Sequence, residues 1–279
     1  MNIINAIINL IKRSDVELNY ISHNNNRINA IGDSLESYVK DLFANSFELS
    51  LSEKIQKQSE VFSYLGNKSN PPDAMLRDGD AIEVKKIEAP TPALVLNSSY
   101  PKAKLFSDSP MISRACREAE NWQEKDLIYI VGVVDRGQKI RHLAMVYGQD
   151  YCADENCYLK IKQKIKAHIE NMADFEFSDT QEFARINRVD PLGITYLRVR
   201  GMWGIENPWT VFRYIYQRDA KYTFNFMAVI NEDKWNSFNN YNELLELKHP
   251  NLRITDVEIQ NPNNPAQLKP AKLITFFYE

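Results

Sequence analysis

The sequence predicts an α/β fold in a single domain. Residues 2–13 repeat isoleucines at the spacing of an amphipathic helix. Residues 127–134 are an unbroken apolar run, which is typical of a strand buried in the centre of a sheet. A chain of 279 residues, 44% of them hydrophobic, is long enough to bury a large core. No internal repeat or linker divides it, so we expect one domain over residues 1–279.

The remaining elements follow from local patterns along the chain. A second helix is expected at 32–45, with Leu35, Tyr38, Val39, Leu42 and Phe43 on its apolar face. Strands are expected at 73–77 and 81–87, followed by a loop at 89–110, a helix at 110–123 and strands at 127–134 and 139–147. A lysine-rich helix at 157–172 precedes strands at 194–200 and 272–278. Residues 209–217 and 222–230 are ordered segments of undecided type.

The stretch 71–86 concentrates reactive side chains around a turn. Asp78-Gly79 is a strong turn signal between two apolar-patterned runs. A two-residue turn would leave Asp73 and Glu83 on opposite faces. A three-residue loop, with Gly79 in the left-handed position of a bulge, places Asp73 opposite Glu83 and Lys85 on the same face. We expect this register because it alone sorts a set of apolar residues onto the other face, namely Ala74, Leu76, Ile82 and Val84.

Two carboxylates and a lysine on one face suit metal-assisted hydrolysis of a phosphodiester. Carboxylate oxygens bind hard divalent cations. Such a cation polarises a phosphate and lowers the pKa of a bound water. A lysine beside it can orient that water or offset charge that develops on the phosphate. The competing interpretation is a surface hairpin with solvated charges, but the separation of charged from apolar residues favours the catalytic one.

The same residues resemble a known nuclease signature. Pro72-Asp73, nine intervening residues and then Glu83-Val84-Lys85 resemble the PD-(D/E)XK motif of restriction-endonuclease-like nucleases. Residues 32–39 are similar to the N-terminal helix of that superfamily, whose glutamate often approaches the metal site; here this residue is Glu36. Residues 79–87 and the chain length resemble the NgoPII-type type II restriction endonucleases, which cut double-stranded DNA at GGCC.

This resemblance implies the finer features of fold and activity. The fold would be a restriction-endonuclease-like core, a mixed central sheet flanked by helices, with inserted DNA-recognition segments. The core would span about residues 30–150 and the recognition segments about residues 185–230. The activity would be Mg²⁺-dependent hydrolysis, with Mn²⁺ as a substitute, of double-stranded DNA at a short palindrome, leaving 5′-phosphate and 3′-hydroxyl ends. A palindrome calls for two active sites related by a two-fold axis, so we expect a homodimer.

The resemblance also assigns roles within the hairpin. Asp73, Glu83 and the carbonyl oxygen of Val84 would hold the metal ion. Glu36 is a candidate supplementary ligand, and an ordinary glutamate on the helix surface is the equal alternative. Lys85 would position the attacking water. Asp73, Glu83 and Lys85 are therefore the expected catalytic residues.

Candidate DNA-contacting residues lie on either side of the predicted central strands. Basic residues interleaved with aromatic ones suit contact with phosphates and base edges. The candidates are Arg198, Arg200, Arg213 and Arg218, together with Lys102 and Lys104 in the loop after the catalytic strand. The aromatic residues could equally belong to the core and the arginines to an ordinary charged surface.

Composition limits the remaining possibilities. The net charge of −3 means that DNA contact depends on local basic patches. Three cysteines are too few for a disulfide framework, and we expect a bacterial cytoplasm. We expect no signal peptide and no membrane span, because the N-terminus lacks a basic region and no run of 18 apolar residues occurs. A repair or junction nuclease on the same core and a non-catalytic DNA-binding protein remain as alternatives.

Overall fold

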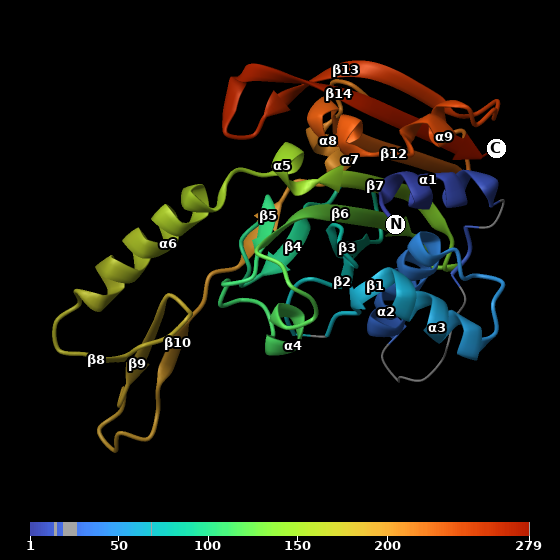
Figure 1. Ribbon diagram of the computed structural model, residues 1–279. Helices are drawn as coiled ribbons and strands as arrows, with labels where there is room; N and C mark the ends of the chain where they lie inside the picture. Colours follow the sequence, from blue (N-terminus) through green and yellow to red (C-terminus); the bar gives the residue numbers. More distant parts are fainter. Residues whose placement is uncertain (14–15, 19–26, 68, 279) are drawn as a thin grey trace.

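The computed structural model describes residues 1–13, 16–18, 27–67 and 69–278. A twisted sheet crosses the centre of the molecule, with helices on both of its faces (Figure 1). In the described chain its strands run in the order β1 (Phe62–Tyr64), β2 (Ala74–Leu76), β3 (Ala81–Ile87), β6 (Glu124–Val134), β7 (Ile140–Tyr147), β12 (Phe224–Asn231), β14 (Asn264–Tyr278) and β13 (Arg253–Asn261), and β5 (Lys104–Phe106) pairs with β6.

The central sheet is mixed. β3 pairs with β6 in parallel, and β7 pairs with β12 in parallel. The pairs β2–β3, β6–β7, β12–β14 and β13–β14 are antiparallel. The predicted α/β fold with a mixed central sheet flanked by helices is therefore confirmed, and it is consistent with a restriction-endonuclease-like core.

Two apolar cores cover the two faces of this sheet. The first lies under α1 (Ile3–Lys12) and α2 (Arg27–Ala44), where Ile7 and Leu42 pack with residues such as Ile128 of β6. The second contains Tyr129 and Val131 of β6, with α5 (Gly148–Tyr151) and α7 (Pro208–Val211) against it. Alternate residues of β6 thus enter opposite cores, which explains its continuous apolar sequence.

The helices α1 and α3 begin at capping boxes. In α1, the side chain of Asn2 accepts from the N–H of Asn5, and the Asn5 side chain accepts from the N–H of Asn2. In α3 (Leu51–Val61), Ser50 and Glu53 make the same reciprocal pair. These bonds satisfy amide groups that a helix leaves free at its start. Helix α3 was not predicted, although Ser50 and Glu53 form a capping-box pattern at its start.

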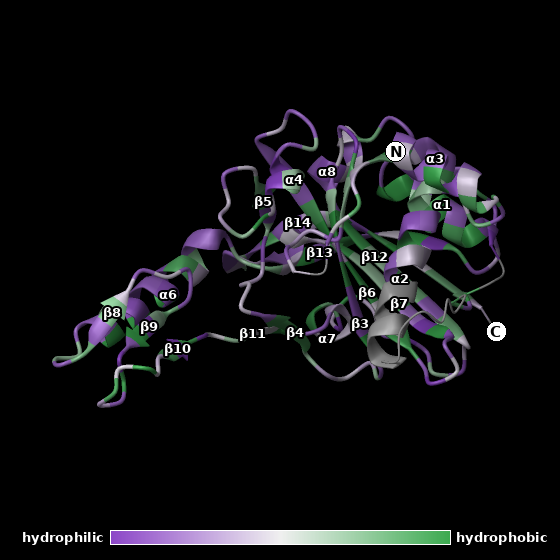
Figure 2. Cartoon of the chain, turned by 90° about the horizontal axis from the view of Figure 1, so that it is seen from below, coloured by the Kyte–Doolittle hydropathy of each residue, from purple (hydrophilic) through white to green (hydrophobic). Residues whose placement is uncertain are grey.

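An arm projects from the body of the molecule. It comprises residues 155–199: α6 (Glu155–Glu170), β8 (Glu176–Ser178), β9 (Ala184–Asn187) and β10 (Leu197–Val199), the strands forming a sheet in the order β10-β9-β8. Figure 2 shows the arm extending away from the central sheet. None of the α6 residues is buried, which suits the many charged side chains of this lysine-rich helix.

Short elements complete the fold around the sheet. β4 (Leu94–Asn97) pairs with β11 (Trp203–Ile205) in a two-stranded sheet. The other short helices are α4 (Arg114–Arg117), α8 (Glu232–Ser237) and α9 (Tyr241–Leu245). The first undecided segment, 209–217, overlaps α7, which begins one residue earlier at Pro208. The second, 222–230, contains most of β12, which extends to Asn231.

The predicted helix at 110–123 is wrong beyond a single turn. α4 spans only four residues. The carbonyl of Cys116 accepts from the indole N–H of Trp122 at 3.3 Å, and the Arg117 side chain donates to the carbonyl of Ser107 at 2.7 Å. These bonds fold the segment back on itself, so tertiary contacts replace helical ones. The predicted loop at 89–110 likewise contains β4 and β5, and the strand at 194–200 is limited to β10.

Candidate active site

The β2–β3 hairpin adopts the predicted register. Ala74 lies opposite Ile82, and Met75 lies opposite Ala81. The N–H of Leu76 donates to the carbonyl of Asp80 at 2.9 Å. Continuing this register by one pair brings Asp73 opposite Glu83.

The conformation of the turn differs from the prediction. Asp78, and not Gly79, has the positive φ, at 53°. Aspartate tolerates this region better than most residues because its short polar side chain can bond locally. The N–H of Gly79 donates to the carbonyl of Leu76 at 3.1 Å and closes the turn. A loop of the expected length therefore forms with the left-handed residue one position earlier.

A buried lysine anchors this turn from the neighbouring strand. The Nζ of Lys125 donates to the carbonyls of Leu76, at 3.1 Å, and of Gly79, at 2.6 Å. Lys125 also forms an ion pair with Glu120, and the two side chains are 5% and 10% exposed. Because these contacts are buried, they fix the turn and, through it, the register of the two strands.

The hairpin separates its apolar and charged residues as the register requires. One face supplies the core under α1 and α2 with Ala74, Leu76, Ile82 and Val84. Met75 and Ala81 enter the opposite core. Strand alternation places Asp73, Glu83 and Lys85 on the face of Met75 and Ala81.

The carboxylate of Asp73 is tied to the next strand. The N–H of Val84 donates to Oδ2 of Asp73 at 2.7 Å. The N–H and C=O of one strand residue lie on the same edge of the strand. The carbonyl of Val84 therefore points to the edge on which Asp73 lies. This direction is the one needed if Asp73, Glu83 and this carbonyl bind the same cation.

Only one of the two carboxylate oxygens of Glu83 accepts a hydrogen bond from the described residues. Its Oε1 accepts from the Nζ of Lys85 at 2.6 Å. Its Oε2 is buried and has no hydrogen-bond partner among the described residues. A buried carboxylate oxygen without a partner is costly, so it is a ready ligand for a cation.

The electrostatics of the cluster favour an added positive charge. Burial raises the pKa of Asp73 to about 8, repulsion from Glu83 and Glu36 adds to this, and Lys85 opposes it. Burial alone would lower the pKa of Lys85, but the attraction of Glu83 and Asp73 raises it overall. The charge of Glu36, on α2, also raises the pKa of Asp73 and of Lys85.

These donors fit a hard divalent cation that keeps part of its water shell. In the described chain no three His, Cys, Asp or Glu side chains converge as a ready-made metal site. Asp73, Glu83 and the Val84 carbonyl offer oxygen atoms only. Proteins commonly bind Mg²⁺ in this way, through one or two carboxylates together with waters and substrate phosphates.

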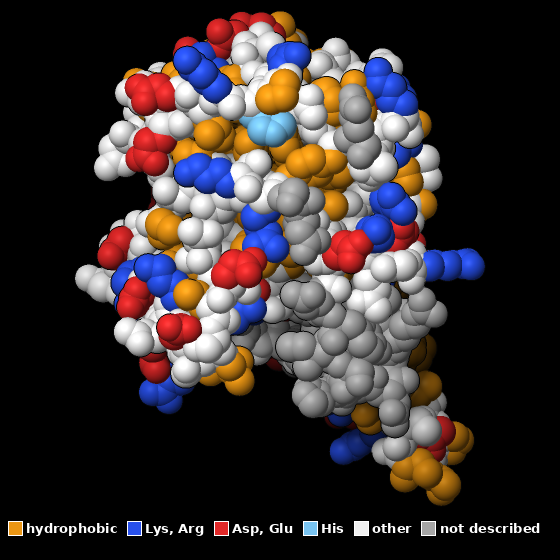
Figure 3. Space-filling view, turned by 90° about the vertical axis from the view of Figure 1, so that its right-hand side faces the viewer, with side chains coloured by type: hydrophobic (Ala, Val, Ile, Leu, Met, Phe, Trp, Pro, Cys, Tyr) orange, Lys and Arg blue, Asp and Glu red, His pale blue; other side chains and the backbone are white. Residues whose placement is uncertain are grey.

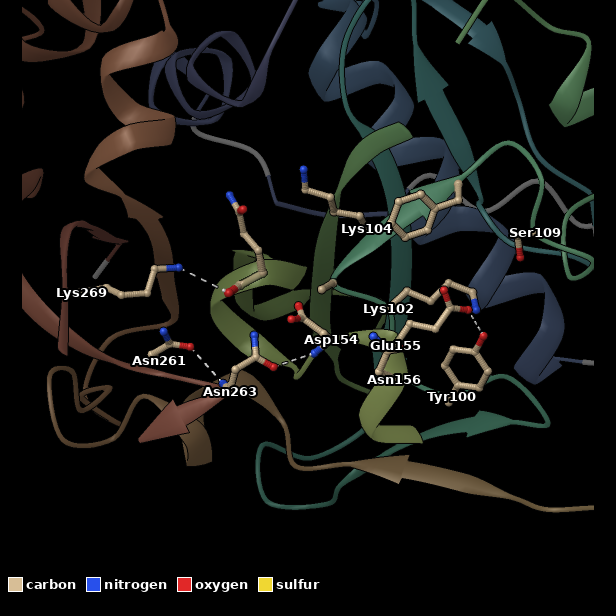
Figure 4. Close-up of a pocket in the computed structure, with 13 residues that line it drawn as sticks. Tyr100, Lys102, Lys104, Ser109, Asp154, Glu155, Asn156, Asn261, Asn263 and Lys269 are labelled. Carbon is tan, nitrogen blue, oxygen red and sulfur yellow. Dashed lines mark hydrogen bonds between the residues drawn. The ribbon is translucent and has the colours of Figure 1, made fainter. Parts of the chain in front are cut away.

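The two candidate lysines of the segment after β4 have different surroundings. Lys104 pairs with Glu124, at 2.6 Å, and lies 3.8 Å from Asp126. Lys102 is buried, with 7% of its surface exposed. Both line a pocket of about 430 Å³ between β5 and the start of α6 (Figure 4).

The four candidate arginines lie in two places. Arg198 and Arg200 lie side by side in and next to β10, where both bond to Glu182. Arg213 is exposed after α7, and Arg218 lies 3.2 Å from Nε2 of His142. The structure thus brings together only the first pair. The neighbouring aromatic residues Trp209 and Phe212 are buried in the core, as the alternative interpretation held.

A further face of the body shows mixed charge. In Figure 3 lysine and arginine side chains alternate with aspartate and glutamate, and the described part of this face has no continuous basic patch. No helix in the described ranges has the length and apolarity needed to cross a membrane.

Two residues next to the hairpin were not predicted. Tyr129 is adjacent to Glu83 in the β3–β6 ladder, and its hydroxyl accepts from the N–H of Lys102 at 2.8 Å. Asp80, which directly follows the turn, is buried and accepts from Lys234 at 2.7 Å. These partners are distant in sequence, so no local pattern could indicate them.

Comparisons with known proteins identify a matching family and a similar enzyme. The NgoPII restriction endonuclease family matches residues 1–260. The Type II restriction enzyme NgoPII of Neisseria gonorrhoeae is 62% identical over 276 residues, which cover 99% of each chain. No solved structure matches. From the family match and the identity over nearly the whole length, the chain belongs to the NgoPII restriction endonuclease family.

Proposed function

We propose that this restriction endonuclease hydrolyses double-stranded DNA at GGCC, with Mg²⁺ held on the β2–β3 hairpin. The observation that carries the mechanism is the convergence of Asp73, Glu83 and Lys85, with the buried Oε2 of Glu83 left without a partner. Membership of the NgoPII family supports GGCC as the site. The identity to a restriction enzyme favours this activity over a repair or junction nuclease and over a non-catalytic DNA-binding protein.

Each hairpin residue has a defined role in this proposal. Asp73, Glu83 and the Val84 carbonyl hold the cation, with Glu36 as a supplementary ligand. The bound cation polarises the phosphate and lowers the pKa of a water molecule. The bond from the Val84 N–H keeps Asp73 oriented. Lys85, which contacts Glu83 in the free protein, turns to the attacking water and to the charge that develops on phosphorus.

The recognition of DNA is assigned to basic residues outside the hairpin. Guanine presents O6 and N7 in the major groove, and arginine can contact both at once. Arg198 and Arg200 in the arm are the proposed readers of base edges, with Arg213, Arg218, Lys102 and Lys104 as further contacts. GGCC is a palindrome, so we propose a homodimer that places one active site on each strand.

Digestion of a plasmid of known sequence tests the activity and the site together. With Mg²⁺ the protein should give discrete fragments whose mapped ends all lie within GGCC. A matched plasmid with every GGCC changed to GGTC should stay intact, as should both plasmids in EDTA. Discrete cutting at another sequence would refute GGCC, and no Mg²⁺-dependent cutting would refute the mechanism. Light scattering of the protein–DNA complex would show one or two copies per duplex.

A further inference from the structure

Lys102 carries a buried ammonium group that the catalytic hairpin does not use. Its Nζ has no hydrogen-bond partner among the described residues. The nearest aromatic ring is that of Tyr100, whose centroid lies 4.1 Å from Nζ. Burial lowers the pKa of Lys102, and Glu155 and Glu83 act against this effect. A buried cation without hydrogen bonds is unfavourable, so the surroundings of Lys102 favour the binding of an anion.

The backbone fixes Lys102 next to the catalytic strand. Its N–H donates to the hydroxyl of Tyr129 at 2.8 Å. Tyr129 in turn lies beside Glu83 in the β3–β6 ladder. The electrostatic effect of Glu83 on Lys102 agrees with this short connection. An anion bound at Lys102 would therefore lie close to the hairpin.

The pocket that Lys102 lines also has the start of α6 in its wall. Asp154, Glu155 and Asn156 line it there (Figure 4). No side chain caps the first turn of this 16-residue helix. Free amides and the positive end of the helix dipole favour an anion at such a position. Two acids also face the pocket, but Glu155 already accepts from the hydroxyl of Tyr100.

The other lysines of the pocket already have carboxylate partners. Lys104 pairs with Glu124, and Lys269 donates to Asp150. Within the described chain, Lys102 is thus the lysine of this pocket whose ammonium lacks a carboxylate contact.

We propose that this pocket binds a phosphate of the DNA backbone near the cleaved bond, with Lys102 as its cation. The inference rests on the proposed function and deepens it by assigning a defined pocket and a backbone phosphate to Lys102. The phosphate oxygens supply the hydrogen bonds that the ammonium lacks, and charge-assisted bonds of this kind are the strong ones. The contact is to the backbone, so it sets the position of the duplex and is independent of sequence.

The first test is the salt dependence of DNA binding, measured with Ca²⁺ in place of Mg²⁺. Lys102→Met removes the charge at similar length, Lys102→Arg keeps it, and Lys57→Met on α3 is the matched control. Lys102→Met should weaken binding to GGCC and unrelated duplexes alike and lower the slope of log affinity against log salt by about one. Lys102→Arg and Lys57→Met should retain the slope. An unchanged slope in Lys102→Met would overturn the proposal.

The second test locates the phosphate and separates binding from folding. The duplexes carry a neutral methylphosphonate at a single backbone position. At one such position the modification should lower the affinity of the wild type but leave the affinity of Lys102→Met unchanged. Lys102→Met should melt at or above the wild-type temperature, because it removes an unpaired buried charge. A large fall in melting temperature would make Lys102 a structural cation and overturn the proposal. If the wild type binds as expected but does not cleave, the proposed function fails while the phosphate pocket stands.

Discussion

The backbone N–H of Val84 donates a 2.7 Å hydrogen bond to Oδ2 of Asp73. This bond joins the residue before β2 to the middle of β3, and it fixes the carboxylate on the edge where the Val84 carbonyl points. The position of Asp73 therefore depends on the register of the hairpin.

Asp73 should be required for cleavage and dispensable for folding. Asp73→Asn keeps an acceptor for the Val84 N–H but loses the charge, whereas Asp73→Ala loses both. We expect both variants to lose Mg²⁺-dependent cleavage and Asp73→Asn to melt at or above the wild-type temperature, since it removes a carboxylate that burial and Glu83 disfavour. Plasmid digestion and thermal melting measure the two effects. Cleavage by Asp73→Asn would contradict the assignment.

The metal-free protein should lose stability as pH rises. Burial raises the pKa of Asp73 from 3.8 to about 8. A group whose pKa is raised on folding contributes stability that is present in full below its unfolded value and is lost as pH rises through the folded value. In EDTA, the melting temperature of the wild type should fall relative to that of Asp73→Asn between about pH 4 and 8. Parallel curves for the two proteins would contradict this.

Lys125 should stabilise the turn strongly because its contacts are buried. Lys125→Met removes the ammonium group that contacts Glu120 and the carbonyls of Leu76 and Gly79. Breaking one side of a buried pair costs about 3–5 kcal/mol. The double variant Glu120→Gln/Lys125→Met should lose less than the sum of the single variants. Urea unfolding of the four proteins measures this coupling, and strict additivity would show that the two residues act separately.

Asp78 should tolerate glycine and reject valine. Its φ of 53° lies in the left-handed region, which costs an ordinary residue about 1–2 kcal/mol. Asp78→Val should lower the free energy of unfolding by at least that amount, and Asp78→Gly should leave it nearly unchanged. Urea unfolding of both variants would check the difference. Equal stabilities would mean that the turn relaxes away from this conformation.

Replacing either arginine bound to Glu182 should weaken binding to GGCC more than binding to unrelated DNA. If Arg198 or Arg200 reads a guanine, its replacement by alanine should cost about 1–3 kcal/mol of affinity for GGCC and little for unrelated DNA. Arg213→Ala provides a comparison from outside the arm. Competition binding with both duplexes measures the ratio. An equal loss on both duplexes would make the pair phosphate contacts, and no loss on either would remove them from the interface.

Local patterns were sufficient for the hairpin and the central strands. The bounds of β3 match the prediction, because Asp78-Gly79 and the alternation of Ile82, Glu83 and Val84 are local signals. The conformation of the turn was harder to predict from the sequence, because both Asp78 and Gly79 can adopt a positive φ. The choice between them involves the bonds that Lys125 makes from another strand.

Features that depend on contacts between distant residues could not be predicted from local sequence patterns. Residues 110–123 contain enough apolar side chains for a helix, but Trp122 folds back onto the carbonyl of Cys116. Lys102 was expected to be a loop residue tracking the DNA backbone. In the structure its N–H donates to the hydroxyl of Tyr129 in β6, and Glu155 at the start of α6 acts on its charge; neither partner is marked by any nearby pattern.

The most direct test of the central claim is single-turnover cleavage of a GGCC duplex by Lys85→Met with Mg²⁺. The adjacent Lys86→Met is the matched control, since strand alternation puts Lys86 on the other face of β3. We predict that Lys85→Met slows cleavage by roughly a hundred- to a thousandfold, while its DNA affinity in Ca²⁺ and its melting temperature stay near those of the wild type and Lys86→Met cleaves normally. Near-wild-type cleavage by Lys85→Met would contradict the assignment of the β2–β3 hairpin as the active site.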